Sequence, residues 1–387
     1  MTPKRITILG TTGSVGQSTL DLIRRSPDRF QVVGLTANRN VDALVRNAIE
    51  FGAQAAAVAD PGCYGALKAA LSGTNVEAMA GPEAVCELAG RSVDYVMAAI
   101  VGAAGLRPTL AAVRTGCHVA FANKECLVTA GDLMMREVAT HGATLLPVDS
   151  EHNAIFQVFD SSQRQMITRL ILTASGGPFR TWTREQMTVA TPQQAVSHPN
   201  WDMGAKISVD SATMMNKGLE LIEAHHLFGF PEDRIDIVVH PQSVIHSMVE
   251  YADGSVLAQL GTPDMRTPIA NTLAWPDRME SPSEKLDFMK LSRLDFEPPD
   301  EDRYPALKLA RDALRSRDGA PVVLNAANEV AVAHFLAGRI GFARIAGIVE
   351  EMLQSVPELV ATDLEAVLEL DAATRRRAEA RLFQAAE

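Results

Sequence analysis

Short apolar runs alternate with segments of helical period over the first 150 residues of this chain. Six runs have the length and composition of buried strands. They cover residues 5–9, 31–37, 55–59, 94–100, 118–122 and 144–148. Between the second and third runs, one face of a predicted helix carries Val41, Leu44, Val45, Ala48 and Ile49. Strands separated by helices predict an α/β fold with a doubly wound parallel sheet, which binds ligands outside the carboxyl ends of its strands.

The pattern changes after residue 150. Runs at 169–173 and 236–239 predict strands, 214–228 predicts a helix, and 243–251 with 255–260 predict a hairpin around the turn dipeptide Asp253-Gly254. We expect an α+β domain whose sheet could also pair two subunits. Prolines at 276, 282, 298 and 299 mark a linker, and helical periods beyond 301 predict a C-terminal helical bundle. The expected domains are therefore 1–149, 150–276 and 301–387, with a linker at 277–300.

Composition excludes several classes of protein. Hydrophobic residues make up 47% and charged residues 21% of the 387 residues, which is ordinary for a globular protein. A net charge of −11 argues against sequence-independent nucleic-acid binding. The most apolar stretch, 93–110, contains charged residues, glycine and proline, so we expect no membrane partner. Four cysteines without CxxC spacing, and an N-terminus without a signal-peptide pattern, predict a cytoplasmic protein with reduced thiols.

A glycine-rich loop follows the first predicted strand and precedes a helix. Gly10, Gly13 and Gly16 have the spacing GxxGxxG rather than GxGxxG. Glycine permits a tight turn and lets the backbone approach a pyrophosphate at the helix N-terminus. A glycine turn without a ligand is the alternative. The combination of strand, loop and helix near residue 10 favours a Rossmann-like dinucleotide site.

The end of the second strand indicates which dinucleotide binds. Sites that prefer NAD place an acidic residue there, to hold the ribose 2′-hydroxyl. Here Ala37, Asn38, Arg39 and Asn40 contain no acid, and Arg39 can pair with a 2′-phosphate. A solvated surface arginine is the alternative for Arg39 alone. The missing acid favours NADPH.

Two carboxylates follow the sixth strand. Asp149 and Glu151 flank Ser150, and in an extended backbone both would point to the same face. Converging carboxylates repel unless a cation neutralises them, and hard oxygen ligands suit Mg²⁺ or Mn²⁺. Glu220, in the helix predicted at 214–228, is the candidate for a third ligand.

The surroundings of Glu220 suggest a phosphate site. Asn216 and Lys217 can share one helix edge with Glu220. Ser211, expected near the start of this helix, would add its hydroxyl beside free backbone N–H groups. An N-capped surface helix is the alternative.

Two further segments carry candidate residues. Ser175 and its neighbours Gly176 and Gly177 follow the strand at 169–173 and could expose backbone donors to a phosphate, although a glycine turn is the commoner explanation. His198 and Trp201 lie in a loop at 198–204 that could fold over a substrate and exclude water. The alternative there is an ordinary loop with an anchoring tryptophan.

Together these motifs resemble the 1-deoxy-D-xylulose 5-phosphate reductoisomerase family, which serves isoprenoid precursor synthesis without mevalonate. The resemblance covers nearly the whole chain. It is carried by residues 10–16, 97–106, 122–125, 145–156, 175–179, 198–204, 206–219, 240–248 and 257–269. It implies a homodimer that rearranges a sugar phosphate by retro-aldol and aldol steps and reduces the product with NADPH, giving 2-C-methyl-D-erythritol 4-phosphate.

The resemblance also implies roles for individual residues. Metal ligands would be Asp149, Glu151 and Glu220. Catalysis would involve Lys124, Asp149, Glu151, His198, Trp201 and Glu220. The substrate would contact Lys124, Ser150, Glu151, Ser175, His198, Ser211, Asn216, Lys217 and Glu220. NADPH would be lined by Thr12, Gly13, Ser14, Val15, Ala37, Arg39, Asn40, Asn123, Glu125 and Gly204.

The chain departs from the family pattern at a few positions. Asn38 stands where glycine is common, Arg39 where lysine is common, and Cys126 where serine is usual. None of these removes a proposed metal or phosphate ligand. Two rivals are a semialdehyde or homoserine dehydrogenase, which shares the glycine loop but needs no metal and phosphate set, and a non-catalytic NADPH sensor.

Overall fold

The computed structural model describes residues 2–201, 203–316, 319–355 and 363–384. Contacts divide the chain into two compact units. The first comprises residues 1–126, 134–153 and 264–283, and the second comprises 127–133, 154–263 and 284–387. The domain bounds expected at 149, 276 and 300 remain a prediction from the sequence.

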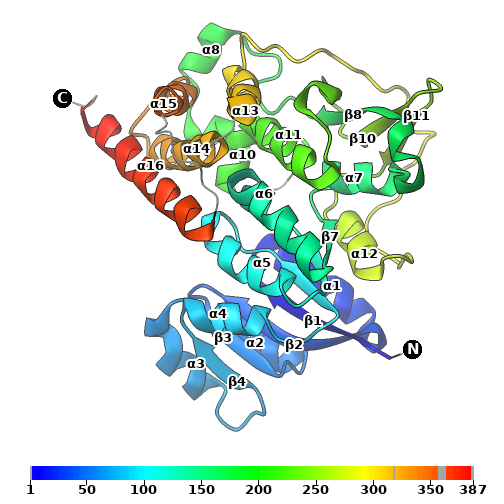
Figure 1. The fold of residues 1–387 in the computed structure, drawn as a ribbon, viewed down its shortest axis with the longest axis vertical. Coiled ribbons are helices and arrows are strands. Elements are labelled where there is room, and N and C mark those ends of the chain that lie inside the picture. The colour runs from blue at the N-terminus through cyan, green and yellow to red at the C-terminus, as the bar shows by residue number, and fades with distance from the viewer. Residues whose placement is uncertain (1, 202, 317–318, 356–362, 385–387) are drawn as a thin grey trace. The chain divides into compact units, whose positions relative to one another are not determined.

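The first unit contains a seven-stranded parallel sheet in the order β4-β3-β2-β1-β5-β6-β7 (Figure 1). Its strands are β1 (Lys4–Leu9), β2 (Phe30–Ala37), β3 (Ala55–Val58), β4 (Glu77–Ala80), β5 (Tyr95–Ala98), β6 (His118–Phe121) and β7 (Thr144–Pro147). Six of these were predicted within a few residues, and the doubly wound fold is confirmed. The sequence missed β4, an edge strand without β-branched residues in which only Met79 is buried.

The order of the strands determines where the helices lie. The helices of this unit are α1 (Ser14–Arg25), α2 (Val41–Glu50), α3 (Tyr64–Ala70), α4 (Pro82–Ala89), α5 (Leu106–Val113), α6 (Lys124–His141) except for its residues 127–133, the start of α7 (Ser150–Val158), and α12 (Arg266–Ala274), with short 3₁₀ turns at Pro27–Arg29, Pro61–Cys63 and Ala103–Gly105. Right-handed crossovers place α1, α2 and α3 on one face and α4, α5 and α6 on the other. The later helix α12 packs on α1. The packing of α2 on α3 and of α4 on α5 agrees with this rule.

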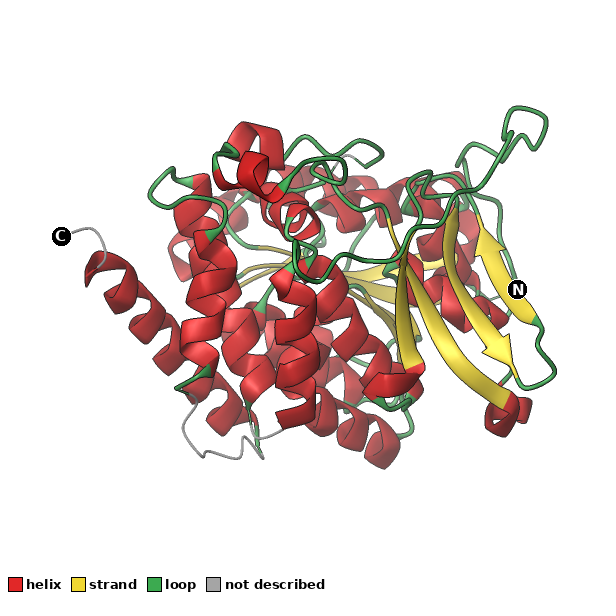
Figure 2. Cartoon of the chain, turned by 90° about the horizontal axis from the view of Figure 1, so that it is seen from above, coloured by secondary structure: helices red, strands yellow, loops and turns green. Residues whose placement is uncertain are grey.

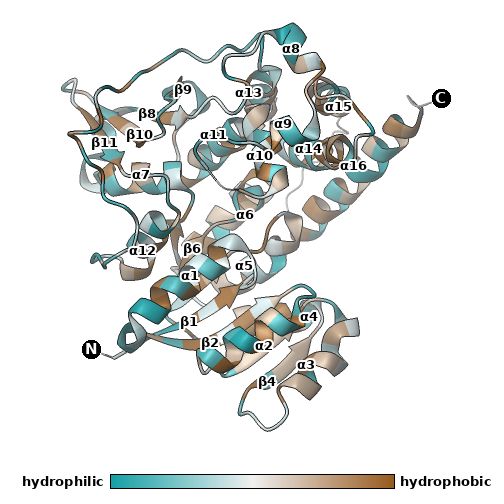
Figure 3. Ribbon diagram, turned by 180° about the vertical axis from the view of Figure 1, so that it is seen from behind, coloured by the Kyte–Doolittle hydropathy of each residue, from teal (hydrophilic) through white to brown (hydrophobic). Residues whose placement is uncertain are grey.

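Burial in the first unit follows the hydrophobic pattern. Ile6 and Ile8 of β1 are fully buried, as are all four residues of β3. In α2, Leu44 and Ala48 face the sheet as predicted, whereas Ile49 is 53% exposed. Figure 3 shows the hydrophilic and hydrophobic sides of this helix in teal and brown. The buried apolar side chains thus hold the strands in place. The candidate site residues predicted from the sequence in this unit follow the carboxyl ends of these strands.

The second unit contains a four-stranded sheet in the order β11-β10-β8-β9. The strands are β8 (Ile167–Ala174), β9 (Ile235–Val239), β10 (Ile245–Tyr251) and β11 (Val256–Leu260). The predicted hairpin of β10 and β11 is confirmed, with Gly254 at φ +87° and the Asp253 carboxylate accepting from the Ser255 N–H at 2.9 Å. β11 is an edge strand, and its Val256 and Leu257 are about half exposed.

Helices make up the rest of the second unit, and Figure 2 shows them beside the yellow strands of this sheet. They are the remainder of α7, α8 (Arg184–Thr188), α9 (Pro192–Ala195), α10 (Ala205–Ala212), α11 (Met215–Phe228), α13 (Pro305–Ser316), α14 (Ala320–Leu336), α15 (Arg344–Leu353) and α16 (Leu364–Gln384), with 3₁₀ turns at Ser161–Met166 and Glu232–Arg234. The last four form the predicted bundle around the buried α14. Among the described residues, no helix combines the length and apolarity needed to cross a membrane.

Candidate active site

The glycine loop has the geometry of a phosphate cradle. Gly10 adopts φ +79°, and its carbonyl accepts a hydrogen bond from the Gly13 N–H at 3.1 Å. A Cβ on Gly16 would lie 2.5 Å from the Gly10 oxygen and 2.6 Å from Thr11 backbone atoms, so only glycine fits there. The first turn of α1 holds no acidic residue, and Gly13 and Ser14 are exposed. Thr12 and Val15 flank this exposed turn, which can receive an anion at the helix N-terminus.

The residues after β2 lie on the surface. Ala37 is buried at the end of the strand, whereas Arg39 and Asn40 are exposed. Arg39 Nε pairs with Asp60 Oδ2 at 2.7 Å, yet its side chain stays 77% exposed. Asn40 caps α2 by accepting from the Ala43 N–H at 3.1 Å. The structure places a cation and no acid directly after β2, as the NADPH prediction requires.

The turn after β6 is held rigidly. Asn123 donates from Nδ2 to the carbonyls of Ile100 and Gly102, and its Oδ1 accepts from the Cys126 N–H at 3.3 Å. These contacts fix the N-terminus of α6, where Lys124 and Glu125 are 6% and 7% exposed. A buried lysine needs a partner, because burial disfavours its charge.

That partner is Asp149. Lys124 Nζ lies 2.6 Å from Asp149 Oδ2, and His152 Nδ1 lies 3.4 Å from Asp149 Oδ1. Burial by itself would raise the pKa of Asp149, but Lys124 and then His152 hold this pKa well below its usual range. Asp149 is therefore ionised although it is buried. A carboxylate must be ionised to bind a cation well.

The reason given above for the convergence of Asp149 and Glu151 was wrong. β7 ends at Pro147 and α7 begins at Ser150, so these residues do not alternate along an extended strand. The turn into α7 brings them together instead: the Asp149 Oδ1 accepts from the Glu151 N–H at 3.3 Å, and carboxylate oxygens of the two residues lie within 4.8 Å. Ser150 donates to Glu151 Oε2 at 2.5 Å.

In the second unit, the Glu220 carboxylate contacts both of the side chains that were predicted to share its helix edge. Asn216 Nδ2 donates to one Glu220 carboxylate oxygen and Lys217 Nζ pairs with the other. Lys217 and Glu220 are 3% and 1% exposed. The predicted shared edge of α11 is therefore confirmed, with an acid and a cation in contact within it.

The predicted position of Ser211 was wrong. Ser211 lies in the last turn of α10 and not at the start of a helix, because the chain breaks at Thr213 and Met214 before α11 begins. Met214 takes φ +60° there. Ser211 nevertheless adjoins the glycine turn, since a Cβ on Gly177 would lie 2.7 Å from the Ser211 carbonyl oxygen.

Ser175 and His198 are in direct contact. His198 Nδ1 accepts from the N–H groups of Asn200 and Trp201 at 3.1 and 3.0 Å, so Nε2 carries the proton and donates to Ser175 Oγ at 2.9 Å. Burial lowers the pKa of His198 to about 4, in keeping with a neutral ring. Ser175 Oγ also accepts from the Gly177 N–H at 3.1 Å.

The loop after His198 has anchors that sequence reasoning missed. Asn200 Nδ2 donates to the Pro241 carbonyl and to Ser243 Oγ at 2.8 and 3.1 Å. The Trp201 ring lies 6.1 Å from that of His246. Gly204 is exposed and precedes α10. Sequence spacing offered no signal for Ser243 or His246, since both lie more than 40 residues along the chain.

Comparisons with known proteins identify the relatives of this fold. Three domain profiles match: "1-deoxy-D-xylulose 5-phosphate reductoisomerase" at residues 6–131, its "C-terminal domain" at 145–228, and "DXP reductoisomerase C-terminal domain" at 260–377. The chain is 63% identical to the reductoisomerase of Rhodospirillum centenum, over 96% of this chain and 93% of that protein. It is 58% identical to that of Zymomonas mobilis, over 98% and 97%.

Comparisons with solved structures point to the same family. The Zymomonas mobilis reductoisomerase in complex with NADPH shares 56% identity at a TM-score of 0.94, covering 99% of each chain. A DOX-P reductoisomerase in complex with NADPH, fosmidomycin and magnesium shares 46% identity at a TM-score of 0.94, covering 98% of each chain.

Proposed function

The chain belongs to the 1-deoxy-D-xylulose 5-phosphate reductoisomerase family, and we propose that it performs this reaction with the residues placed above. The enzyme isomerises 1-deoxy-D-xylulose 5-phosphate and reduces the rearranged aldehyde with NADPH, giving 2-C-methyl-D-erythritol 4-phosphate. The observation that carries the proposal is the ionised Asp149 beside Lys124 and Glu151, at the carboxyl end of a sheet that also bears the glycine loop. A simple dehydrogenase needs no such cluster.

NADPH binds at the carboxyl end of the first sheet. The glycine loop takes its pyrophosphate, with Thr12, Gly13, Ser14 and Val15 at the start of α1. Arg39, with Asn40 beside it, takes the 2′-phosphate. The rigid turn at Asn123 and Glu125 and the exposed Gly204 complete the lining. The support is the open N-terminus of α1 and the acid-free end of β2.

Asp149, Glu151 and Glu220 hold one divalent ion, Mg²⁺ or Mn²⁺. The donor set fits, because all three offer hard carboxylate oxygens and Asp149 is held ionised. Relatives of this chain were crystallised with magnesium. When bound, the ion supplies Lewis acidity to the oxygens of the substrate.

The remaining residues position the substrate. Lys217, Asn216, Ser211 and Ser175 take its phosphate, and this remote binding energy can be used to orient the reacting carbons. Ser150 contacts the sugar backbone. The Lys124 ammonium, fixed by Asp149, stabilises negative charge that develops on substrate oxygens.

The loop at 198–204 closes over the bound substrate. The neutral His198 offers its Nε2 proton, which it now donates to Ser175, as a hydrogen-bond donor to the substrate. Trp201 covers the site and excludes water. The hydrogen bonds of Asn200 to Pro241 and Ser243 support a defined position for the residues directly after His198.

Two chains assemble as a homodimer, and the protein works in the cytoplasm. The exposed edge of β11, with half-exposed Val256 and Leu257, is a surface on which a second copy can extend the sheet. No nucleic acid or membrane takes part.

Turnover with and without chelator tests this function. We expect NADPH oxidation with 1-deoxy-D-xylulose 5-phosphate and Mg²⁺, none after chelation, and none with aspartate semialdehyde. Glu220→Gln should keep NADPH affinity and lose most turnover, whereas the matched variant Glu369→Gln, exposed on α16, should retain both. Normal activity of Glu220→Gln would remove Glu220 from the metal site. Activity that persists in chelator would contradict the metal-dependent reaction.

A further inference from the structure

A buried carboxylate lies directly before Ser211, outside the set of residues assigned to the predicted site. Asp210 is in the last turn of α10 and is 1% exposed. One of its oxygens, Oδ2, pairs with Lys206 Nζ at 2.8 Å, one helical turn earlier in α10. The other oxygen accepts a hydrogen bond from Asn328 Nδ2 at 2.8 Å. A buried charge is tolerated when it is paired and hydrogen-bonded, and Asp210 meets both conditions.

Asn328 reaches Asp210 from the C-terminal bundle, 118 residues further along the chain. It lies in α14 and is fully buried, and among the described residues its Oδ1 has no hydrogen-bond partner. A hydrophobic side chain would fill this place without the cost of burying an amide. The asparagine therefore indicates that the contact itself matters, since it joins α14 to the last turn of α10.

The contact holds one side of the junction between α10 and α11. The Asp210 carbonyl accepts from Thr213 Oγ1 at 3.2 Å, and Thr213 Oγ1 accepts from the Met215 N–H at 3.3 Å. The end of α10 is thereby tied to the start of α11 across the break between the two helices. Ser211 lies in this last turn of α10, and the first turn of α11 carries two further residues proposed to take the substrate phosphate. A shift of Asp210 therefore shifts phosphate residues on both helices.

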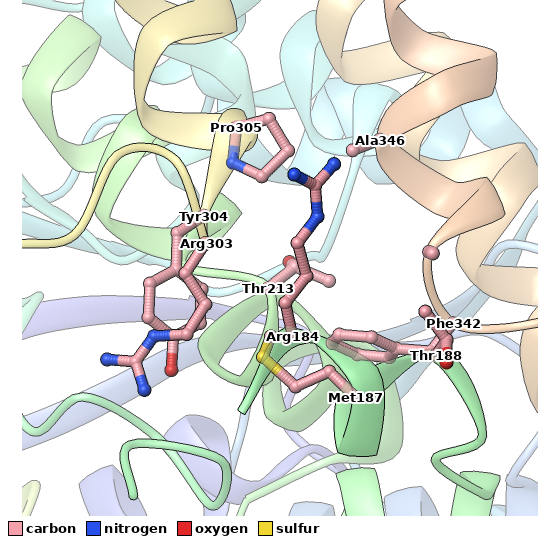
Figure 4. Close-up of a pocket in the computed structure, with 10 residues that line it drawn as sticks. Arg184, Met187, Thr188, Thr213, Arg303, Tyr304, Pro305, Phe342 and Ala346 are labelled. Carbon is pink, nitrogen blue, oxygen red and sulfur yellow. The ribbon is translucent and has the colours of Figure 1, made fainter. Parts of the chain in front are cut away.

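Packing alone leaves this junction incompletely supported. Thr213 lines a cavity of about 100 Å³, whose other walls come from α8, the start of α13 and the segment that leads into α15 (Figure 4). Met187 and Phe342 supply apolar surface there. A side chain that borders a void has no packing partner on that side. The hydrogen bond from Asn328 to Asp210 supplies a restraint that packing at Thr213 does not.

We propose that Asp210 and Asn328 are positioning residues for the substrate phosphate, so that the C-terminal bundle supports the phosphate site. This role rests on the proposed function, because it requires that Ser211 and its neighbours bind that phosphate. Both side chains are buried, so they act on the substrate through the backbone of α10 and not by touching it. Phosphate binding stabilises the bound substrate and the transition state alike, so a loosened turn acts mainly on KM.

Steady-state kinetics of two asparagine variants of the full chain test this role. Asn328→Ala should raise KM for 1-deoxy-D-xylulose 5-phosphate by about tenfold or more, with a much smaller change in kcat and an unchanged Kd for NADPH. Asn325→Ala is the matched control, because Asn325 is also a fully buried asparagine of α14 but donates to Glu329 in the same helix at 3.1 Å. It should lower the unfolding midpoint about as much and keep KM.

Asp210→Asn tests the same contact from α10, and it decides the matter where Asn328→Ala does not fold. The amide oxygen of the new side chain can accept the hydrogen bond but carries no charge, so KM should rise by about threefold. In the double variant the contact is already lost, so KM should stay close to that of Asn328→Ala.

An unchanged KM in Asn328→Ala would overturn the role of this contact, as would an equal rise of KM in Asn325→Ala. An unchanged KM in Asp210→Asn, or rises that multiply in the double variant, would overturn it too. A chain that does not turn over 1-deoxy-D-xylulose 5-phosphate at all contradicts the proposed function. Normal turnover by the unchanged chain, with the same KM in Asn328→Ala, removes only the positioning role and leaves the proposed function standing.

Discussion

Replacing Arg39 by glutamine separates the cofactor role of this residue from any structural role. Arg39 pairs with Asp60 at 2.7 Å, but its side chain is 77% exposed, so this pair contributes at most about 1 kcal/mol to folding. A hydrogen bond between the guanidinium and the 2′-phosphate of NADPH is worth about 1.5–3 kcal/mol, which corresponds to a factor of about 10 to 150. NADH lacks this phosphate, so the loss of the hydrogen bond should not lower kcat/KM for NADH.

The assay is kcat/KM for NADPH and for NADH at saturating substrate and Mg²⁺. Arg39→Gln should lower the NADPH-to-NADH ratio by about 10- to 150-fold and leave the unfolding midpoint almost unchanged. Arg46→Gln, at an exposed arginine on α2, is the matched control and should keep the ratio. An unchanged ratio in Arg39→Gln, or an equal loss with both cofactors, would refute the assignment of the 2′-phosphate to Arg39.

Other variants probe the remaining parts. Gly16→Ala should abolish NADPH binding, measured by fluorescence titration, because its Cβ would lie 2.5 Å from the Gly10 carbonyl; wild-type affinity would disprove the tight cradle. Lys217→Ala should raise KM for the phosphorylated substrate by about tenfold or more, and an unchanged KM would count against its phosphate role. Truncating Trp201 to alanine should lower kcat through poorer closure, whereas wild-type kinetics would leave Trp201 as a loop anchor. Burial lowers the pKa of His246 to about 4, below its unfolded value of about 6.5, so its neutral form stabilises the fold above pH 6.5 and this contribution is lost as pH falls toward 4. In urea unfolding, the free energy of unfolding of His246→Gln should therefore fall less over that pH range than that of the unchanged chain. An identical fall in both would contradict this role of His246.

Much of the fold could be predicted because the pattern of buried residues is regular. The strands of the first sheet are apolar runs separated by helices, so a doubly wound parallel sheet could be predicted from them. The sequence pattern did not predict β4, because an edge strand needs few buried residues and because Glu77, Ala78 and Ala80 have no preference for strands. Local periodicity therefore located the core strands and missed the edge.

The candidate site was predictable where function depends on local chain geometry. The glycine loop and the edge of α11 each lie within a few residues, so spacing reveals them. Ser211 was misplaced because the break at Met214, with φ +60°, has no signature in an apolar, non-glycine residue. Asn200, Ser243 and His246 meet only through tertiary contacts, and spacing along the chain cannot show those.

Carbon-13 NMR of the product tests the central claim most directly. The chain is incubated with ¹³C-labelled 1-deoxy-D-xylulose 5-phosphate, NADPH and Mg²⁺, and the connectivity of the labelled carbons is read. The account predicts the branched skeleton of 2-C-methyl-D-erythritol 4-phosphate, formed in proportion to the NADPH consumed. An unbranched reduced sugar phosphate, or NADPH consumption without rearrangement, would contradict it.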